Sequence, residues 1–143
     1  MKISNVQSVV SWDATIFALQ AATRRAEEIG IKVNVAVVDS SGNLTGFLRM
    51  PGAFLHSIDI AIDKAYTAAG FGLPTIEWTE ALQQHSEAVR NGIPLRPRMV
   101  CFGGGLPLWH EGRLIGGIGV SGGSEAEDED CARAGLGAID LVG

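Results

Sequence analysis

Glycine is the residue that most constrains how this chain folds. Most of its 19 glycines lie after position 100, among apolar segments typical of strands. A residue without Cβ permits tight turns and lets another backbone approach closely, so this clustering favours compact packing over a flexible linker. Hydrophobic residues make up 46% of the 143 positions, enough for one core. We therefore expect a single domain over residues 1–143.

Apolar periodicity and turn residues predict helices that alternate with pairs of strands. Ser11 is a good N-cap for the first helix and Gly30 a good stop, while Ser124 and Glu127 form a capping box for the last. Helices are expected over 11–30, 57–70, 74–90 and 124–140, and strands over 33–38, 44–50, 98–102, 106–110 and 113–121. Short turns between neighbouring strands imply antiparallel pairing. The expected fold is α+β, a central antiparallel sheet of about five strands with helices packed on it.

The charge balance excludes two classes of partner. There are 11 basic and 16 acidic residues, for a net charge of -5, and no basic cluster. Such a chain does not neutralise phosphates, which excludes non-specific nucleic-acid binding, and it has no polybasic membrane anchor. Its start does not resemble a signal peptide and no apolar run is long enough to cross a membrane, so we expect a cytoplasmic protein.

The segment from Gly117 to Gly122 matches the pattern G-x-G-x-x-G. A dinucleotide site also needs a following parallel strand and an acidic residue about 20 positions on, and the remaining residues predict only one helix. We interpret these glycines as positions where a helix packs closely on the sheet.

Two glycine segments are candidates for anion binding through backbone N–H groups. Gly122 and Gly123 precede a helix N-terminus, and Gly103 to Gly105 would form a second nest. The acidic run 125–130 competes for these groups, so a ligand site and a purely structural role both stay open. For the acidic run itself we favour a solvated first helical turn over a metal site.

Arg49 and Lys64 are the cationic candidates for holding a carboxylate. Arg49 ends a predicted strand and offers a bidentate guanidinium, while Lys64 lies on the next helix. The alternative is a surface arginine and an ordinary ion pair of Lys64 with Asp59 or Asp63. Taken alone, Arg49 and Lys64 favour this alternative.

The three histidines, His56, His85 and His110, show no spacing typical of a metal site. A haem iron needs only one such donor, and His56 is best placed because it lies beside Ser57 and near Arg49 and Lys64. No attachment motif for covalent haem is present.

Six segments resemble one family, in the same order and over about residues 11–140. They are VVDSSG (37–42), RMPGA (49–53), SIDIAIDKAYTA (57–68), GGLPL (104–108), GGIGVSGG (116–123) and DEDCARAG (128–135). They resemble the GlcG/HbpS family, also called the haem-degrading family, which includes the C-terminal domain of the propanediol-utilisation adenosyltransferase.

The resemblance implies a compact fold around an antiparallel sheet and assembly into homo-oligomers. It also implies a small ligand, either haem or another tetrapyrrole, or a small carboxylate. Arg49 and Lys64 would then pair with propionates, and His56 would approach the iron. The remaining expected ligand-binding residues are Ser57, Gly104, Gly105, Ser121, Gly122 and Gly123.

Two other functions stay open at this point. One is an enzyme that hydrolyses, deaminates or isomerises a small mono- or dicarboxylate, with Arg49 and Lys64 as anchors and His56 or Asp59 as general acid or base. The other is a non-catalytic oligomeric accessory protein. The segment 77–98 matches no motif of the family and is either a pocket wall or a variable loop.

Overall fold

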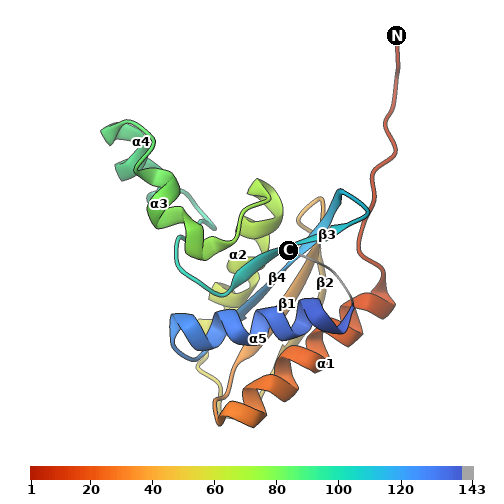
Figure 1. The fold of residues 1–143 in the computed structure, drawn as a ribbon, viewed down its shortest axis with the longest axis vertical. Coiled ribbons are helices and arrows are strands. Elements are labelled where there is room, and N and C mark those ends of the chain that lie inside the picture. Colours follow the sequence, from red (N-terminus) through yellow and green to blue (C-terminus); the bar gives the residue numbers. More distant parts are fainter. Residues whose placement is uncertain (140–143) are drawn as a thin grey trace.

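A four-stranded antiparallel sheet lies at the centre of the computed structural model, which describes residues 1–139 (Figure 1). Its strands are β1 (Asn34–Asp39), β2 (Leu44–Arg49), β3 (Gly105–His110) and β4 (Arg113–Ser121), in the order β2-β1-β4-β3. All neighbouring strands pair antiparallel. The α+β class expected from the sequence is confirmed.

Helices cover both faces of this sheet. The helices α1 (Trp12–Ile29) and α5 (Glu125–Ala138) lie together on one face, and α2 (His56–Phe71) covers the other (Figure 1). Successive side chains of β1 point to opposite faces of the sheet. Val35 and Val37 therefore join the core under α1 and α5, whereas Ala36 and Val38 join the core under α2.

Local signals in the sequence place the ends of these elements correctly. The Ser11 hydroxyl accepts a hydrogen bond from the Ala14 amide, and Gly30 ends α1 in the left-handed conformation. Ser124 and Glu127 form the predicted capping box of α5. The two-residue turn between β3 and β4 has positive φ at both Glu111 and Gly112, as tight hairpins require.

Glycines in β4 let α2 approach the sheet with its backbone. A Cβ atom on Gly119 would collide with the carbonyl oxygen of Ala61, and one on Gly117 with that of Ala65. The interpretation of these glycines as helix-packing positions is therefore confirmed for Gly117 and Gly119, whereas Gly122 lies against Lys32 and Val33.

The expectation of about five strands is wrong by one, because residues 98–102 do not form a strand. Arg98 has a φ of 66°, outside the extended region. The Thr67 hydroxyl on α2 donates to the Arg98 carbonyl and accepts from the Val100 amide. These backbone groups therefore bind a side chain instead of a neighbouring strand.

The single helix expected over 74–90 is also wrong. This stretch is divided into η1 (Thr75–Glu77), α3 (Trp78–Leu82) and α4 (Glu87–Gly92), followed by η2 (Ile93–Leu95). The Ser86 hydroxyl caps a new helix by accepting from the Val89 amide, which ends the continuity of the helix. The α3–α4 arm projects away from the sheet (Figure 1).

The described part of the chain begins with an extended segment and ends just after the last helix. Residues 1–9 have no helix or strand and extend away from the body at the N-terminus (Figure 1). The last helix ends at Ala138, and the expected end at Asp140 lies outside the described residues. No helix within residues 1–139 combines the length and apolar character needed to span a membrane.

The glycine contact makes a testable prediction. We expect Gly119→Ala to lower the free energy of unfolding by about 1–3 kcal/mol, because the new methyl group meets helix backbone that cannot move aside. Chemical denaturation measures the change. The matched control is Gly70→Ala on α2, where an added Cβ meets nothing within 4 Å. Equal stability of the two variants would contradict this account of the packing.

Candidate functional site

Polar residues line up across one end of the sheet on the face that α2 covers. Asn34 on β1 pairs with Arg49 on β2 and with Ser121 on β4. Paired residues of neighbouring strands point to the same face, so the three side chains form a row. Asn34 donates from Nδ2 to the Phe54 carbonyl, while its buried Oδ1 has no hydrogen-bond partner within residues 1–139.

A cavity of about 310 Å³ lies beside this row. It is bordered by the N-terminal half of α2, the segment before β3, the end of β4 and the start of α5. Its lining consists of Phe54, Ser57, Lys64, Phe102, Ser121, Gly122, Gly123, Glu125 and Asp128.

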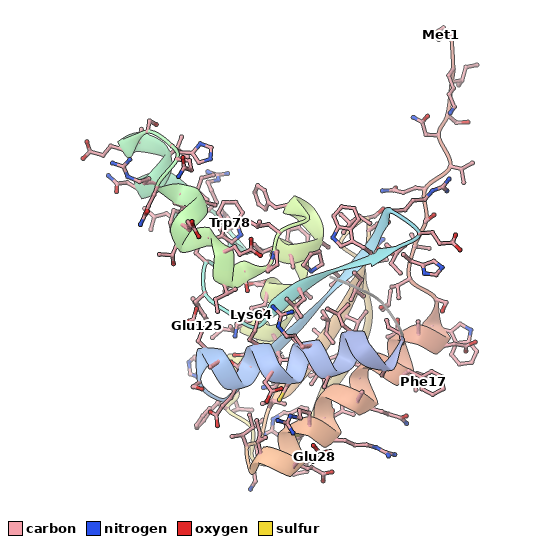
Figure 2. The ribbon with its side chains drawn as sticks, viewed as in Figure 1. Met1, Phe17, Glu28, Lys64, Trp78 and Glu125 are labelled. Atoms are coloured by element: carbon pink, nitrogen blue, oxygen red, sulfur yellow. The ribbon has the colours of Figure 1, made fainter. Side chains whose placement is uncertain are left out.

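Lys64 forms the cationic floor of the cavity. Helical spacing puts Ser57, Ala61 and Lys64 on one face of α2, towards the sheet. The Lys64 side chain is only 1% exposed, and its Nζ donates to the Val120 carbonyl at 2.8 Å and to Asp128 Oδ2 at 3.1 Å. It therefore links α2 to β4 and α5 (Figure 2).

Burial perturbs both members of this ion pair. Desolvation lowers the pKa of Lys64, although the carboxylate of Asp128 opposes the shift. Desolvation likewise raises the pKa of Asp128, against the opposing effects of Lys64 and the Gly123 amide. Both shifts favour the uncharged forms. Lys64 therefore holds its proton less firmly than a lysine at the protein surface does.

The carboxylates of α5 occupy the backbone N–H groups that were candidates for anion binding. Glu125 accepts from the Gly103 amide at 2.6 Å and Glu129 from the Gly104 amide at 3.2 Å. Asp128 accepts from the Gly123 amide at 2.9 Å. The chain thus supplies its own anions to both glycine segments.

The interpretation of the whole acidic run 125–130 as a solvated turn is wrong, because Asp128 and Glu129 are buried. Burial raises the pKa of Glu129, and Arg133 pairs with its carboxylate. Within residues 1–139, no group of three or more His, Cys, Asp or Glu side chains is placed to hold a metal ion.

Most of the expected ligand-binding residues meet at this cavity. Ser57, Lys64, Ser121, Gly122 and Gly123 line it. Gly104 and Gly105 lie behind the lysine. A Cβ on Gly104 would be 2.7 Å from Lys64 Nζ, and one on Gly105 would be 2.6 Å from the Lys64 carbonyl oxygen.

Besides these two glycines, three expected site residues stay outside the lining. Arg49 is exposed and donates from Nη2 to the Ala53 carbonyl at 2.8 Å. His56, the first residue of α2, and Asp59 in its first turn are also exposed. Arg49 and Lys64 are therefore not brought together as a pair of carboxylate anchors.

Sequence reasoning missed several residues of the cavity. Phe54 and Phe102 border it with side chains that are 67% and 47% exposed, and the Lys64 Nζ lies 5.1 Å from the Phe102 ring centroid. Asp128 and Glu125 belong to the acidic run 125–130, where nothing distinguishes them from the other carboxylates. Asp128 could be identified only by knowing that Lys64 pairs with a residue of the last helix. The spacing of residues along either helix does not indicate this pairing.

The segment 77–98 does not contribute to this cavity. Its last residues instead border a second hollow of about 280 Å³ beside α2, lined by apolar side chains together with Arg96 and Arg98. None of the site residues expected from the sequence lies in that lining.

Comparison with known proteins gives matches over nearly the whole chain. The family described as haem degrading protein HbpS-like matches residues 10–137. The corrinoid adenosyltransferase PduO of Citrobacter freundii is 40% identical over 122 residues, which cover 85% of this chain and 36% of that protein. The chain therefore spans about a third of the length of this curated relative.

Solved structures show the same architecture. The protein ORFY of Klebsiella pneumoniae has a TM-score of 0.91 at 32% identity and is covered to 99%, with all of this chain matched. The crystal structure of a PduOC:heme complex has a TM-score of 0.86 at 36% identity, covering 94% of this chain and 97% of that one.

The buried ion pair makes the second prediction. We expect Lys64→Met to lower the free energy of unfolding by about 3–5 kcal/mol, because it leaves Asp128 buried without its cation. The matched control is Arg25→Met, which breaks exposed pairs with Glu28 and Asp130 and is expected to cost less than about 1 kcal/mol. Urea denaturation of both variants checks the difference, and similar losses would contradict it.

Proposed function

We propose that this chain, which belongs to the HbpS-like family, is a small-ligand-binding protein with its ligand in the cavity at Lys64. We propose haem as this ligand. The observation that carries the proposal is the cavity itself, where two partly exposed phenylalanine rings border a polar floor. A solved relative that aligns with 94% of this chain is described as a heme complex, which supports the choice of ligand.

The lining fits the apolar edge of a tetrapyrrole. Phe54 and Phe102 offer aromatic surface, and Ser57 and Ser121 offer hydroxyl groups. A volume of about 310 Å³ is at the lower end of the range for small-molecule sites, so it accommodates one edge of a macrocycle and leaves the rest against the exposed surface.

The charges of the cavity bear on where an anionic group would lie. Lys64 is already paired with Asp128, and Glu125 adds a second carboxylate. A propionate or a free carboxylate ligand gains little from this lysine. The propionates of a haem are therefore better matched by an exposed cation outside the lining, and Arg49 stays our candidate.

A bound haem would supply an iron atom that a protein donor such as histidine coordinates. No histidine lines the cavity within the described chain, and His56 lies in the first turn of α2, beside Ser57, which does. His56 is therefore the residue that we propose as axial ligand. His85 and His110 are also exposed, but neither they nor their immediate neighbours line the cavity.

The haem proposal is tested by titrating the protein with hemin and following the Soret band. We expect a saturable shift at one haem per chain, and we expect His56→Ala to change the position of the band or abolish the shift. His110→Ala is the matched control, an exposed histidine away from the cavity that should leave the spectrum unchanged. Non-saturating adsorption to the wild-type protein would contradict haem binding. An unchanged spectrum in His56→Ala would show that a residue other than His56 is the axial ligand.

We further propose that the chain forms a homo-oligomer. The outer side of α1 exposes Trp12, Ile16 and Phe17, at 72%, 44% and 59%. Large apolar side chains gathered on one helix of a small domain favour a covered surface, and a second copy of the chain is the simplest cover.

Assembly is checked by sedimentation velocity. We expect the wild-type chain to sediment above the monomer mass, and Ile16→Lys to shift it towards the monomer, because a charge would be buried in an apolar contact. Gln83→Lys, at an exposed polar position after α3 and not on α1, is the matched control and should leave the mass unchanged. A monomeric wild-type protein would overturn the proposal.

A further inference from the structure

The position of Lys64 carries a chemical consequence beyond holding the fold together. It is the one amine in the lining of the cavity, and its Nζ lies beside a carboxyl group that is itself buried. We propose that Lys64 is a reactive amine that condenses with a small, uncharged aldehyde or ketone in this cavity to form an imine.

One N–H bond of Nζ has no hydrogen-bond partner within residues 1–139. A lysine ammonium group has three N–H bonds, and two partners are present, the Val120 carbonyl and Asp128. Lys64 and the partly exposed Phe102 both line the cavity, and the centroid of the Phe102 ring lies 5.1 Å from Nζ. A carbonyl compound in the cavity would therefore meet the amine beside this ring.

Burial favours a neutral amine at Lys64, against the effect of the charged groups around it, and a proton acceptor lies beside Nζ. Three carboxylates act on it, Asp128, Glu125 and Glu129, all from α5, and Arg133 pairs with the last. Burial nevertheless lowers the pKa of Lys64 and raises that of Asp128. Transfer of one proton from Nζ to Oδ2 gives an unprotonated amine, which is the nucleophilic form, beside a carboxylic acid.

The step balances with these two groups alone. The lone pair of Nζ forms a bond to the carbonyl carbon, and the oxygen of the substrate takes a proton from Asp128. A proton leaves the nitrogen for the Asp128 carboxylate, which completes a neutral carbinolamine. Asp128 then protonates the hydroxyl group, water leaves as the C=N bond forms, and the last N–H proton returns to Asp128. The net change is amine plus carbonyl to imine plus one water, without any oxidant or reductant.

The cavity selects the substrate by size and charge. A volume of about 310 Å³ restricts the substrate to a small molecule. Glu125 and Asp128 disfavour an anion, so an uncharged carbonyl compound is preferred over a keto acid. This reactivity shares the cavity with the proposed haem site but does not depend on haem. Hemin titration and carbonyl trapping can therefore fail separately.

The sequence offers an internal control, because the chain has three lysines, Lys2, Lys32 and Lys64, and the first two are exposed. The experiment treats the full wild-type chain, without hemin, with acetaldehyde and cyanoborohydride at pH 7. Peptide mass mapping then measures ethylation at each lysine. We expect Lys64 to be ethylated faster than Lys2 or Lys32, because a lowered pKa leaves more of the amine in its neutral form.

The pH profile and the substrate charge give two further readouts. Ethylation at Lys64 should reach half its maximal rate at a lower pH than ethylation at Lys32. The ratio of pyruvate trapping to acetaldehyde trapping should be lower at Lys64 than at the exposed Lys32, and Glu125→Gln should raise this ratio at Lys64 while keeping an acceptor for the Gly103 amide.

Several results would overturn the inference. Ethylation of Lys64 at or below the rate of the two exposed lysines would show that the amine is inaccessible or protonated. A ratio of pyruvate to acetaldehyde trapping at Lys64 equal to or above the ratio at Lys32 would overturn the assignment to uncharged substrates. The wild-type comparison needs no variant at Lys64, so it decides the question even if Lys64→Arg does not fold.

Discussion

Close contact between the backbone of α2 and the glycines of β4 determines the geometry of the rest of the molecule. Where Gly117 and Gly119 lack side chains, the helix carbonyls of Ala65 and Ala61 take the space that Cβ atoms would fill. Lys64 lies on the same helix turn, so this short separation brings its Nζ within 2.8 Å of the Val120 carbonyl. A helix held farther from the sheet by ordinary side chains would not place the lysine within reach of Asp128.

The sequence predicted the elements whose signals are local. Caps at Ser11, Gly30 and Ser124 and the Glu111-Gly112 turn each act over a few residues, and the structure has all of them. Failures occurred where a distant residue decides the backbone. The 98–102 segment is apolar enough for a strand, but its hydrogen bonds go to Thr67, which is 31 residues from Arg98. Nothing in the segment itself reveals that partner.

The candidate site shows the same division between local and distant causes. Helical spacing placed Ser57 and Lys64 on one face, and the Gly122-Gly123 pair was correctly expected beside a helix N-terminus. The partner of Lys64 was not predictable, because Asp128 comes from α5, 64 residues away. Asp128 can be buried only because α5 starts beside Lys64. An acidic run considered by itself predicts the opposite, a solvated turn.

The self-capping of the glycine segments explains why the cavity differs from an ordinary anion site. Backbone N–H groups at a helix N-terminus favour a bound phosphate or carboxylate. Here Glu125, Asp128 and Glu129 satisfy such groups from within the chain. What remains for a ligand is a buried amine under aromatic side chains, with its charge already balanced. Such a site gains most from apolar contact and from the chemistry of the amine, and least from ligand charge. The same reasoning relates the haem proposal to the lysine proposal, because both place an uncharged part of the ligand in a cavity where α5 already pairs the lysine and adds a further carboxylate.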